Sequence, residues 1–201
     1  MAQLTSAGRR PLWIALLVVA SVVFSLGFAC AVPLAAFAAI AALTLSRRDA
    51  FALVGAIWLA NQIAGFAVHH YPVTASTLAW GARLGAVALL STLAAQWVKD
   101  HLAQSHMAAA AAAFLAVFAM YEGSLFAISL ALASGVSNYT PSIVWRIFAI
   151  NAAAFAALFL VHRLGVFGGL GPRPPFPRAN AGLDARPMRN LESASKTWPS
   201  S

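Results

Sequence analysis

The chain has 201 residues, of which 61% are hydrophobic and only 9% are charged, and its formal net charge is +8. A soluble domain has about 45–50% apolar and about 25% charged residues, so this composition excludes a soluble fold. The positive charge does not indicate nucleic-acid binding, because most lysines and arginines flank apolar segments or lie in the C-terminal tail, where such residues orient membrane proteins. A single cysteine excludes an internal disulfide.

Six apolar segments follow one another, and we predict that each forms a transmembrane helix, since the hydrocarbon core needs about 20 apolar residues per helix. The first segment resembles a signal peptide, but it is longer than the usual apolar region of about 7–15 residues, and we predict that it is retained. The second is the shortest and starts near Pro33, a residue suited to a first helical turn. The six segments are Pro11–Phe28, Val32–Leu45, Ala50–Val68, Thr77–Val98, Met107–Ala133 and Pro141–Val161.

Basic residues occur in every second break between these segments. With six spans, Arg47-Arg48, Lys99 and Arg163 fall on the same side as Arg9-Arg10, and the connections on the other side contain no lysine or arginine. With five spans this pattern breaks. The positive-inside rule therefore predicts six crossings with both termini cytoplasmic. We expect an all-α, polytopic membrane helix bundle over residues 1–167, placed in the lipid bilayer of a bacterial inner membrane.

The composition changes at Gly168, after which proline, glycine, serine and arginine predominate. Because too few apolar residues remain to bury a core, we predict that residues 168–201 form a disordered cytoplasmic tail. An alternative is that the proline-rich stretch Pro172–Pro177 docks on a cytoplasmic partner.

Polar side chains inside membrane spans are costly, and they are therefore the first candidates for function. Glu122 lies near the middle of its span, and several others lie in the outer halves of theirs, which predicts a polar pocket that opens outward. The candidate ligand-binding residues are Glu122, Arg83, Arg146, Asn61, Gln62, Asn151 and Trp80. We predict no catalytic residue, no metal ligand and no cofactor.

Structural roles compete with this interpretation. Glu122 paired with Arg83 or Arg146 could lock three helices together, because an ion pair reduces the cost of a carboxylate in hydrocarbon. Asn61 and Gln62 could form interhelical hydrogen bonds. The His69-His70 pair supplies only two imidazoles for a metal, and its place next to Tyr71 favours a role at the membrane interface.

Small residues recur at helical spacing in the second segment, in the pairs Ala35 and Ala39 and Ala38 and Ala42. Such faces let helices approach closely. They could pack against a partner subunit, but packing inside the bundle is the favoured interpretation.

The span count, the length, the cytoplasmic termini and these alanine faces resemble the substrate-binding component of energy-coupling factor transporters. The resemblance covers Pro11 to Val161. It implies a vitamin or metal-related nutrient bound near the outer face, a transmembrane coupling subunit as partner, and cytoplasmic ATPases that supply energy. The alanine motif of that family lies in its first helix, whereas here the regular spacing is in the second segment, and no binding residue carries over.

A different class of function remains open beside uptake. The chain could be a non-transporting accessory or assembly subunit of a larger membrane complex. A membrane enzyme is not expected, because the sequence offers no nucleophile and no acid–base pair at a plausible spacing.

Overall fold

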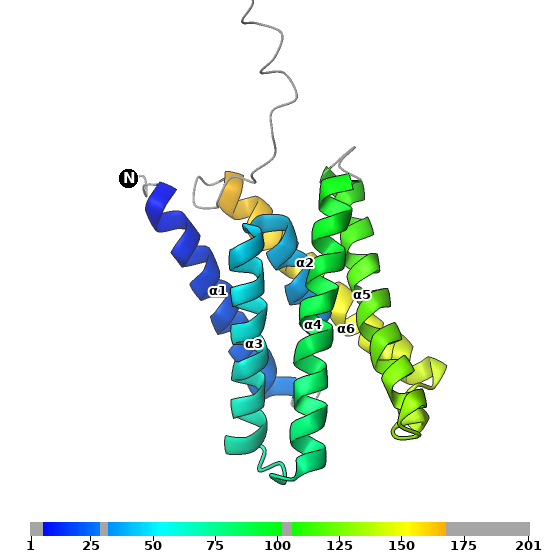
Figure 1. Ribbon diagram of the computed structural model, residues 1–201. Coiled ribbons are helices and arrows are strands. Elements are labelled where there is room, and N and C mark those ends of the chain that lie inside the picture. Colours follow the sequence, from blue (N-terminus) through cyan, green and yellow to red (C-terminus); the bar gives the residue numbers. More distant parts are fainter. Residues whose placement is uncertain (1–5, 29–31, 102–105, 168–201) are drawn as a thin grey trace, which may run out of the picture.

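The computed structural model describes the backbone of residues 6–28, 32–101 and 106–167 and the side chains of residues 11–25, 32–101 and 107–167. The tail predicted over 168–201 lies outside the described residues. Within the described ranges the chain is helical and contains no strand. The elements are α1 (Ser6–Phe28), α2 (Leu34–Thr44), α3 (Arg47–Ala67), α4 (Ala75–His101), α5 (His106–Ala131), the 3-10 turn η1 (Val136–Asn138) and α6 (Pro141–Phe167) (Figure 1).

These six helices correspond to the six predicted segments, so the all-α class is confirmed. Helices α3, α4, α5 and α6 are long and apolar enough to cross a membrane, whereas α2 is shorter, and the part of α1 with described side chains forms a shorter apolar helix, Pro11–Ser25. Helices α4 and α6 extend past the predicted ends, to His101 and Phe167. The protein therefore has the character of a multi-pass membrane protein, with four helices long and apolar enough to cross a membrane.

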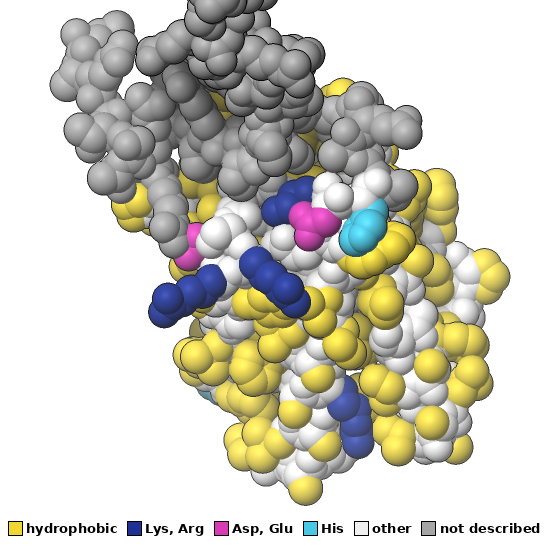
Figure 2. Space-filling model, turned by 45° about the horizontal axis from the view of Figure 1, so that its top comes forward, with side chains coloured by type: hydrophobic (Ala, Val, Ile, Leu, Met, Phe, Trp, Pro, Cys, Tyr) yellow, Lys and Arg dark blue, Asp and Glu magenta, His cyan; other side chains and the backbone are white. Residues whose placement is uncertain are grey.

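The helices run up and down between two ends of the molecule. Helices α1, α3 and α5 begin at the upper end in Figure 1, and α4 and α6 finish there. Figure 2 shows charged side chains gathered at this end above a mostly apolar surface. We call it the basic end, defined by Arg47, Arg48, Lys99 and Arg163. The opposite, distal end carries the α3–α4 and α5–α6 connections, residues 68–74 and 132–140, which contain no lysine or arginine.

Helix α2 lies at the centre of the bundle and contacts α3, α4, α5 and α6. Every residue from Leu34 to Thr44 is buried. Its alanine-rich surface allows this, because small side chains let four neighbours approach one helix closely. The prediction that the Ala-x-x-x-Ala faces pack inside the bundle is therefore confirmed.

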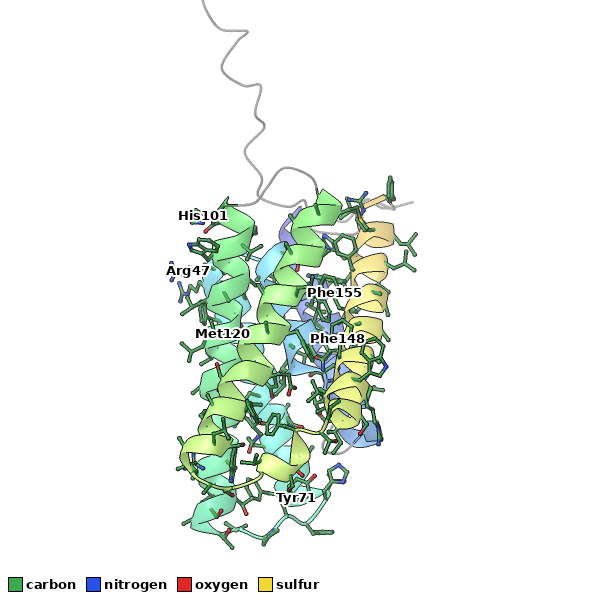
Figure 3. All side chains as sticks on the ribbon, turned by 90° about the vertical axis from the view of Figure 1, so that its right-hand side faces the viewer. Arg47, Tyr71, His101, Met120, Phe148 and Phe155 are labelled. Atoms are coloured by element: carbon green, nitrogen blue, oxygen red, sulfur yellow. The ribbon has the colours of Figure 1, made fainter. Side chains whose placement is uncertain are left out.

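The outer helices are held by different contacts. Helix α1 packs on α3, whereas α6 packs on α2 and meets α5 mainly through aromatic side chains. The rings of Phe114 and Phe155 lie 5.0 Å apart, as do those of Phe118 and Phe148. Figure 3 shows Phe148 and Phe155 between the α5 and α6 ribbons. Aromatic pairs at such distances add to the stabilisation from buried area.

Both ends of α2 are joined to other helices by hydrogen bonds. At the C-terminal end, Lys99 Nζ donates to the Ala42 carbonyl at 2.8 Å, and Trp13 Nε1 donates to Thr44 Oγ1 at 3.0 Å. At the N-terminal end, the preceding Pro33 gives no side-chain cap. Instead, Asn151 Oδ1 of α6 accepts a hydrogen bond from the Ala36 amide at 3.2 Å. Asn151 thus satisfies one of the free amides that every helix N-terminus exposes.

Candidate functional site

A cavity of about 210 Å³ lies next to the N-terminal end of α2. We call it the α2 cavity. Its walls come from α4, α5 and α6, from the α5–α6 connection and from the residue that precedes Pro33. The lining residues are Val32, Leu84, Tyr121, Glu122, Leu125, Asn138, Tyr139, Ile143, Ile147, Ile150 and Asn151.

The short length of α2 explains why space is left at this place. With 11 residues, α2 is about 16 Å long, roughly half of the ~30 Å hydrocarbon thickness. The neighbouring helices α4, α5 and α6 are more than twice as long and continue to the distal end. Because Asn138 and Tyr139 of the α5–α6 connection line the cavity, it lies in the distal half of the bundle.

Glu122 is the one acidic side chain that lines the α2 cavity. It is half-buried on α5, and it forms no hydrogen bond or ion pair with another residue of the described ranges. A carboxylate in this setting has unused acceptor capacity. A ligand that carries a positive charge or hydrogen-bond donors could therefore use it.

Two tyrosines stand beside Glu122. Tyr121 precedes it on α5 and is buried, and Tyr139 follows η1 and is partly buried. Burial and the negative charge of Glu122 raise the pKa of the Tyr139 phenol, and a hydrogen bond with the Ser129 side chain opposes this. Tyr139 is therefore a neutral phenol at physiological pH, and its hydroxyl can both donate and accept a hydrogen bond.

Asn151 lines the cavity and also forms a hydrogen bond that holds α2 and α6 together. Its Oδ1 holds the Ala36 amide, and its Nδ2 donates to the Ile147 carbonyl one turn earlier at 3.0 Å. Its side chain is 4% exposed. The N-terminal end of a helix carries a partial positive charge. The Asn151 side chain therefore lies at the place where α2 presents that charge to the cavity.

Taken together, the lining combines one carboxylate, two phenols and two amides with branched apolar side chains. Such a mixture is typical of sites for small organic molecules, in which an apolar wall supplies contact area and a few polar groups fix the orientation. The described residues contain no group of three or more His, Cys, Asp or Glu that could hold a metal ion.

Only two of the predicted ligand-binding residues, Glu122 and Asn151, line this cavity. Trp80 and Arg83 contact each other instead, with the Arg83 guanidinium 5.1 Å from the centre of the Trp80 ring. Arg146 is exposed on α6. The hypothesis of an ion pair between Glu122 and either arginine is therefore wrong for the described part of the chain. The reason is local, because Arg83 has an aromatic partner three residues earlier on its own helix and the Arg146 side chain points outward.

The remaining predicted pair, Asn61 and Gln62, is half-buried on α3. Gln62 packs against Gly81 of α4, where any larger residue would collide with its side-chain oxygen. One turn earlier, Trp58 Nε1 donates to the Gly81 carbonyl at 2.8 Å. Gln62 therefore belongs to the α3–α4 interface rather than to the α2 cavity, and no contact of Asn61 with the cavity lining is seen.

The two histidines of the α3–α4 connection have different surroundings. His69 Nε2 lies 3.2 Å from the Ser25 carbonyl of α1, and its ring stacks on Tyr71 at 6.0 Å. His70 is exposed and has a φ of 52°. His69 thus links the distal connection to α1, and its predicted place at the membrane interface stays a prediction.

The sequence interpretation missed Tyr121, Asn138 and Tyr139. Tyr121 could have been found, because it is adjacent to Glu122 in a span. Asn138 and Tyr139 lie in a connection that was predicted to be external, and nothing in the local sequence indicates that this connection turns back against α5.

Three comparisons with known proteins were made for the whole chain. No protein-family model, no curated protein sequence and no solved structure matches it. The resemblance to a substrate-binding component of energy-coupling factor transporters therefore stays a prediction, and the α2 cavity is the basis on which function is inferred below.

Proposed function

We propose that this protein is the substrate-binding component of a nutrient uptake system and that the α2 cavity holds the ligand. The observation that carries this proposal is a helix that stops halfway through the bundle beside a cavity with a carboxylate that has no partner among the described residues. Half-length helices beside polar cavities at membrane depth are a recurrent way of binding solutes in transporters. A purely structural bundle gains nothing from leaving a carboxylate beside an open space.

The proposal includes a topology. Since α1 and α3 both begin at the basic end, the chain returns between them by way of α2, which gives six crossings in all. The positive-inside rule places the basic end in the cytoplasm. The distal half, with the α2 cavity, then faces outward. Within the 201 residues no nucleotide-binding motif is present, and we propose that a coupling subunit and cytoplasmic ATPases supply the energy for transport.

The cavity also restricts the ligand. Its volume of about 210 Å³ is below the ~300–1,000 Å³ of pockets for drug-sized molecules. We therefore propose a single-ring compound of vitamin type, with a cationic or hydrogen-bond-donating group at Glu122 and its apolar face against Leu125 and Ile147.

A ligand screen by thermal unfolding in detergent tests the proposal. A ligand at 100 times its dissociation constant stabilises the folded state by about 2.7 kcal/mol. We expect one member of a panel of vitamins and metal complexes to raise the melting temperature of the native protein but not that of Glu122→Gln. Asp100→Asn, an exposed change at the basic end, is the matched control and should respond like the native protein. A panel without any effect, together with a membrane partner that co-purifies stably, would favour an accessory subunit instead.

Reporter fusions test the topology separately. Fusions after Arg48, Lys99 and Arg163 should report a cytoplasmic position, and one at Tyr71 should report an external position. A cytoplasmic signal at Tyr71 would remove the outward orientation of the α2 cavity.

A further inference from the structure

A second cavity lies between α1 and α6, near the basic end. Its volume is about 370 Å³, and it shares no lining residue with the α2 cavity. We call it the α1–α6 cleft. It is lined by Leu12, Trp13, Leu16, Val161, His162, Leu164 and Gly165. The proposed uptake function leaves this cleft without a role.

His162 is the polar side chain in this otherwise apolar cleft. It is 5% exposed, and its Nδ1 atom has no hydrogen-bond partner in the described part of the chain. Its ring centre lies 5.0 Å from that of Trp13, but the Trp13 indole N–H is already bound to Thr44. A buried polar atom without a partner costs free energy, so a ligand group that forms a hydrogen bond with this atom would be stabilised in the cleft.

The depth of His162 indicates what that ligand is. Helix α6 has 27 residues, or about 40 Å along its axis, but it runs obliquely across the bundle in Figure 1 and therefore covers less than this length across a membrane with a hydrocarbon core of ~30 Å. His162 precedes the last residue, Phe167, by five positions, or about 7.5 Å. It therefore lies close to the boundary between hydrocarbon and headgroups, the level of the ester carbonyls of a phospholipid.

The cleft is also open to the lipid. Leu12 is 50% exposed, Leu16 is 39% exposed and Leu164 is 60% exposed, so their outer surfaces are accessible to acyl chains. Next to His162, the exposed Arg163 adds a positive charge, and its guanidinium lies 5.7 Å from the centre of the Phe167 ring. This charge beside the cleft favours an anionic headgroup.

We propose that the α1–α6 cleft binds an anionic phospholipid from the leaflet at the basic end. An ester carbonyl accepts a hydrogen bond from the Nδ1–H of neutral His162, because a neutral imidazole donates through one ring nitrogen. The phosphate pairs with Arg163, and an acyl chain lies along Leu12 and Leu16. The lipid would then add a link between α1 and α6 beside the ring contact of Trp13 with His162.

Lipid binding to the full-length protein in detergent, measured by native mass spectrometry, tests the proposal. We expect phosphatidylglycerol to bind about tenfold more tightly than phosphatidylcholine, and His162→Leu and Arg163→Gln each to weaken phosphatidylglycerol binding by a similar factor. His101→Leu and Arg48→Gln change exposed residues of the same types at the same end, and they should leave binding unchanged.

Two further measurements separate the alternatives. Leu16→Trp fills the cleft while His162 itself is unchanged, and it should also weaken phosphatidylglycerol binding. Circular dichroism checks that each variant keeps the native helix content. Glycerol phosphate without acyl chains should not compete. Equal binding of both lipids, unchanged binding in folded His162→Leu and Leu16→Trp, or full competition by glycerol phosphate would each overturn the proposal.

Discussion

The two ends of α2 are held by different contacts. At the basic end, Lys99 and Trp13 from two helices bind the last turn of α2 directly. At the other end one amide, Asn151, binds the first turn, and the α2 cavity begins beside it. The contacts of α2 at the basic end are therefore structural. At the other end, Asn151 both holds the first turn of α2 and lines the proposed ligand site. Three substitutions and one titration test this difference between the two ends.

The largest effect is expected for Asn151→Leu. The change removes the acceptor for the Ala36 amide at a place where water has little access, and an unsatisfied buried donor costs about 1–3 kcal/mol. It should also abolish ligand binding, because Asn151 lines the α2 cavity. Chemical unfolding in detergent measures the stability. Asn61→Leu is the control, since Asn61 is a half-buried span residue away from α2, and an equal loss in that variant would contradict the special role of Asn151.

A smaller loss is expected for Lys99→Met at the opposite end of α2. The Ala42 carbonyl loses its donor, but Lys99 is only half-buried, and water at the basic end can replace part of the bond. We expect a loss of about 0.5–1.5 kcal/mol in unfolding free energy and no change in ligand affinity. Arg48→Met, in an exposed position, is the control. A loss of ligand binding in Lys99→Met would show that the two ends of α2 are not independent.

Glu122→Gln should change stability least among these substitutions. Because Glu122 has no ion-pair partner within the described ranges, its amide isostere should alter the unfolding free energy by less than about 0.5 kcal/mol, as surface-like substitutions do. The double variant Glu122→Gln with Arg83→Gln should show no rescue. A large loss in the single variant that the double variant recovers would restore the ion-pair hypothesis.

The smallest effect is a pH dependence. The pKa of Tyr139 is raised by burial and by the charge of Glu122, so the folded state prefers the neutral phenol. This contribution to stability is present below the pKa of an unfolded tyrosine and is lost as the pH rises through the higher pKa of the folded protein. Ultraviolet titration of tyrosinate, with Tyr139→Phe to identify the signal, should show a lower Tyr139 pKa in Glu122→Gln. An unchanged pKa would mean that the two groups do not interact.

Much of this protein could be predicted from the sequence because the relevant signals are local. Apolar runs predict helices wherever the solvent is lipid, since the backbone must satisfy its own hydrogen bonds there. The six helices occur where these runs occur, and the alternation of basic breaks matches a molecule with one basic end. The short, alanine-rich second segment correctly indicated a helix packed inside the bundle.

The tertiary structure alone decided how the helices are placed and rotated around α2. Glu122 and Asn151 line one cavity, whereas Arg83 and Arg146 do not. The sequence could not predict this, because hydropathy fixes neither the rotation of a helix nor the partner of a side chain. Tyr139 reaches the cavity only because a distal connection turns back against α5. Likewise, Trp13 and His162 are about 150 positions apart in the sequence but adjacent in space, and contacts at such separation depend on packing, which no local pattern records.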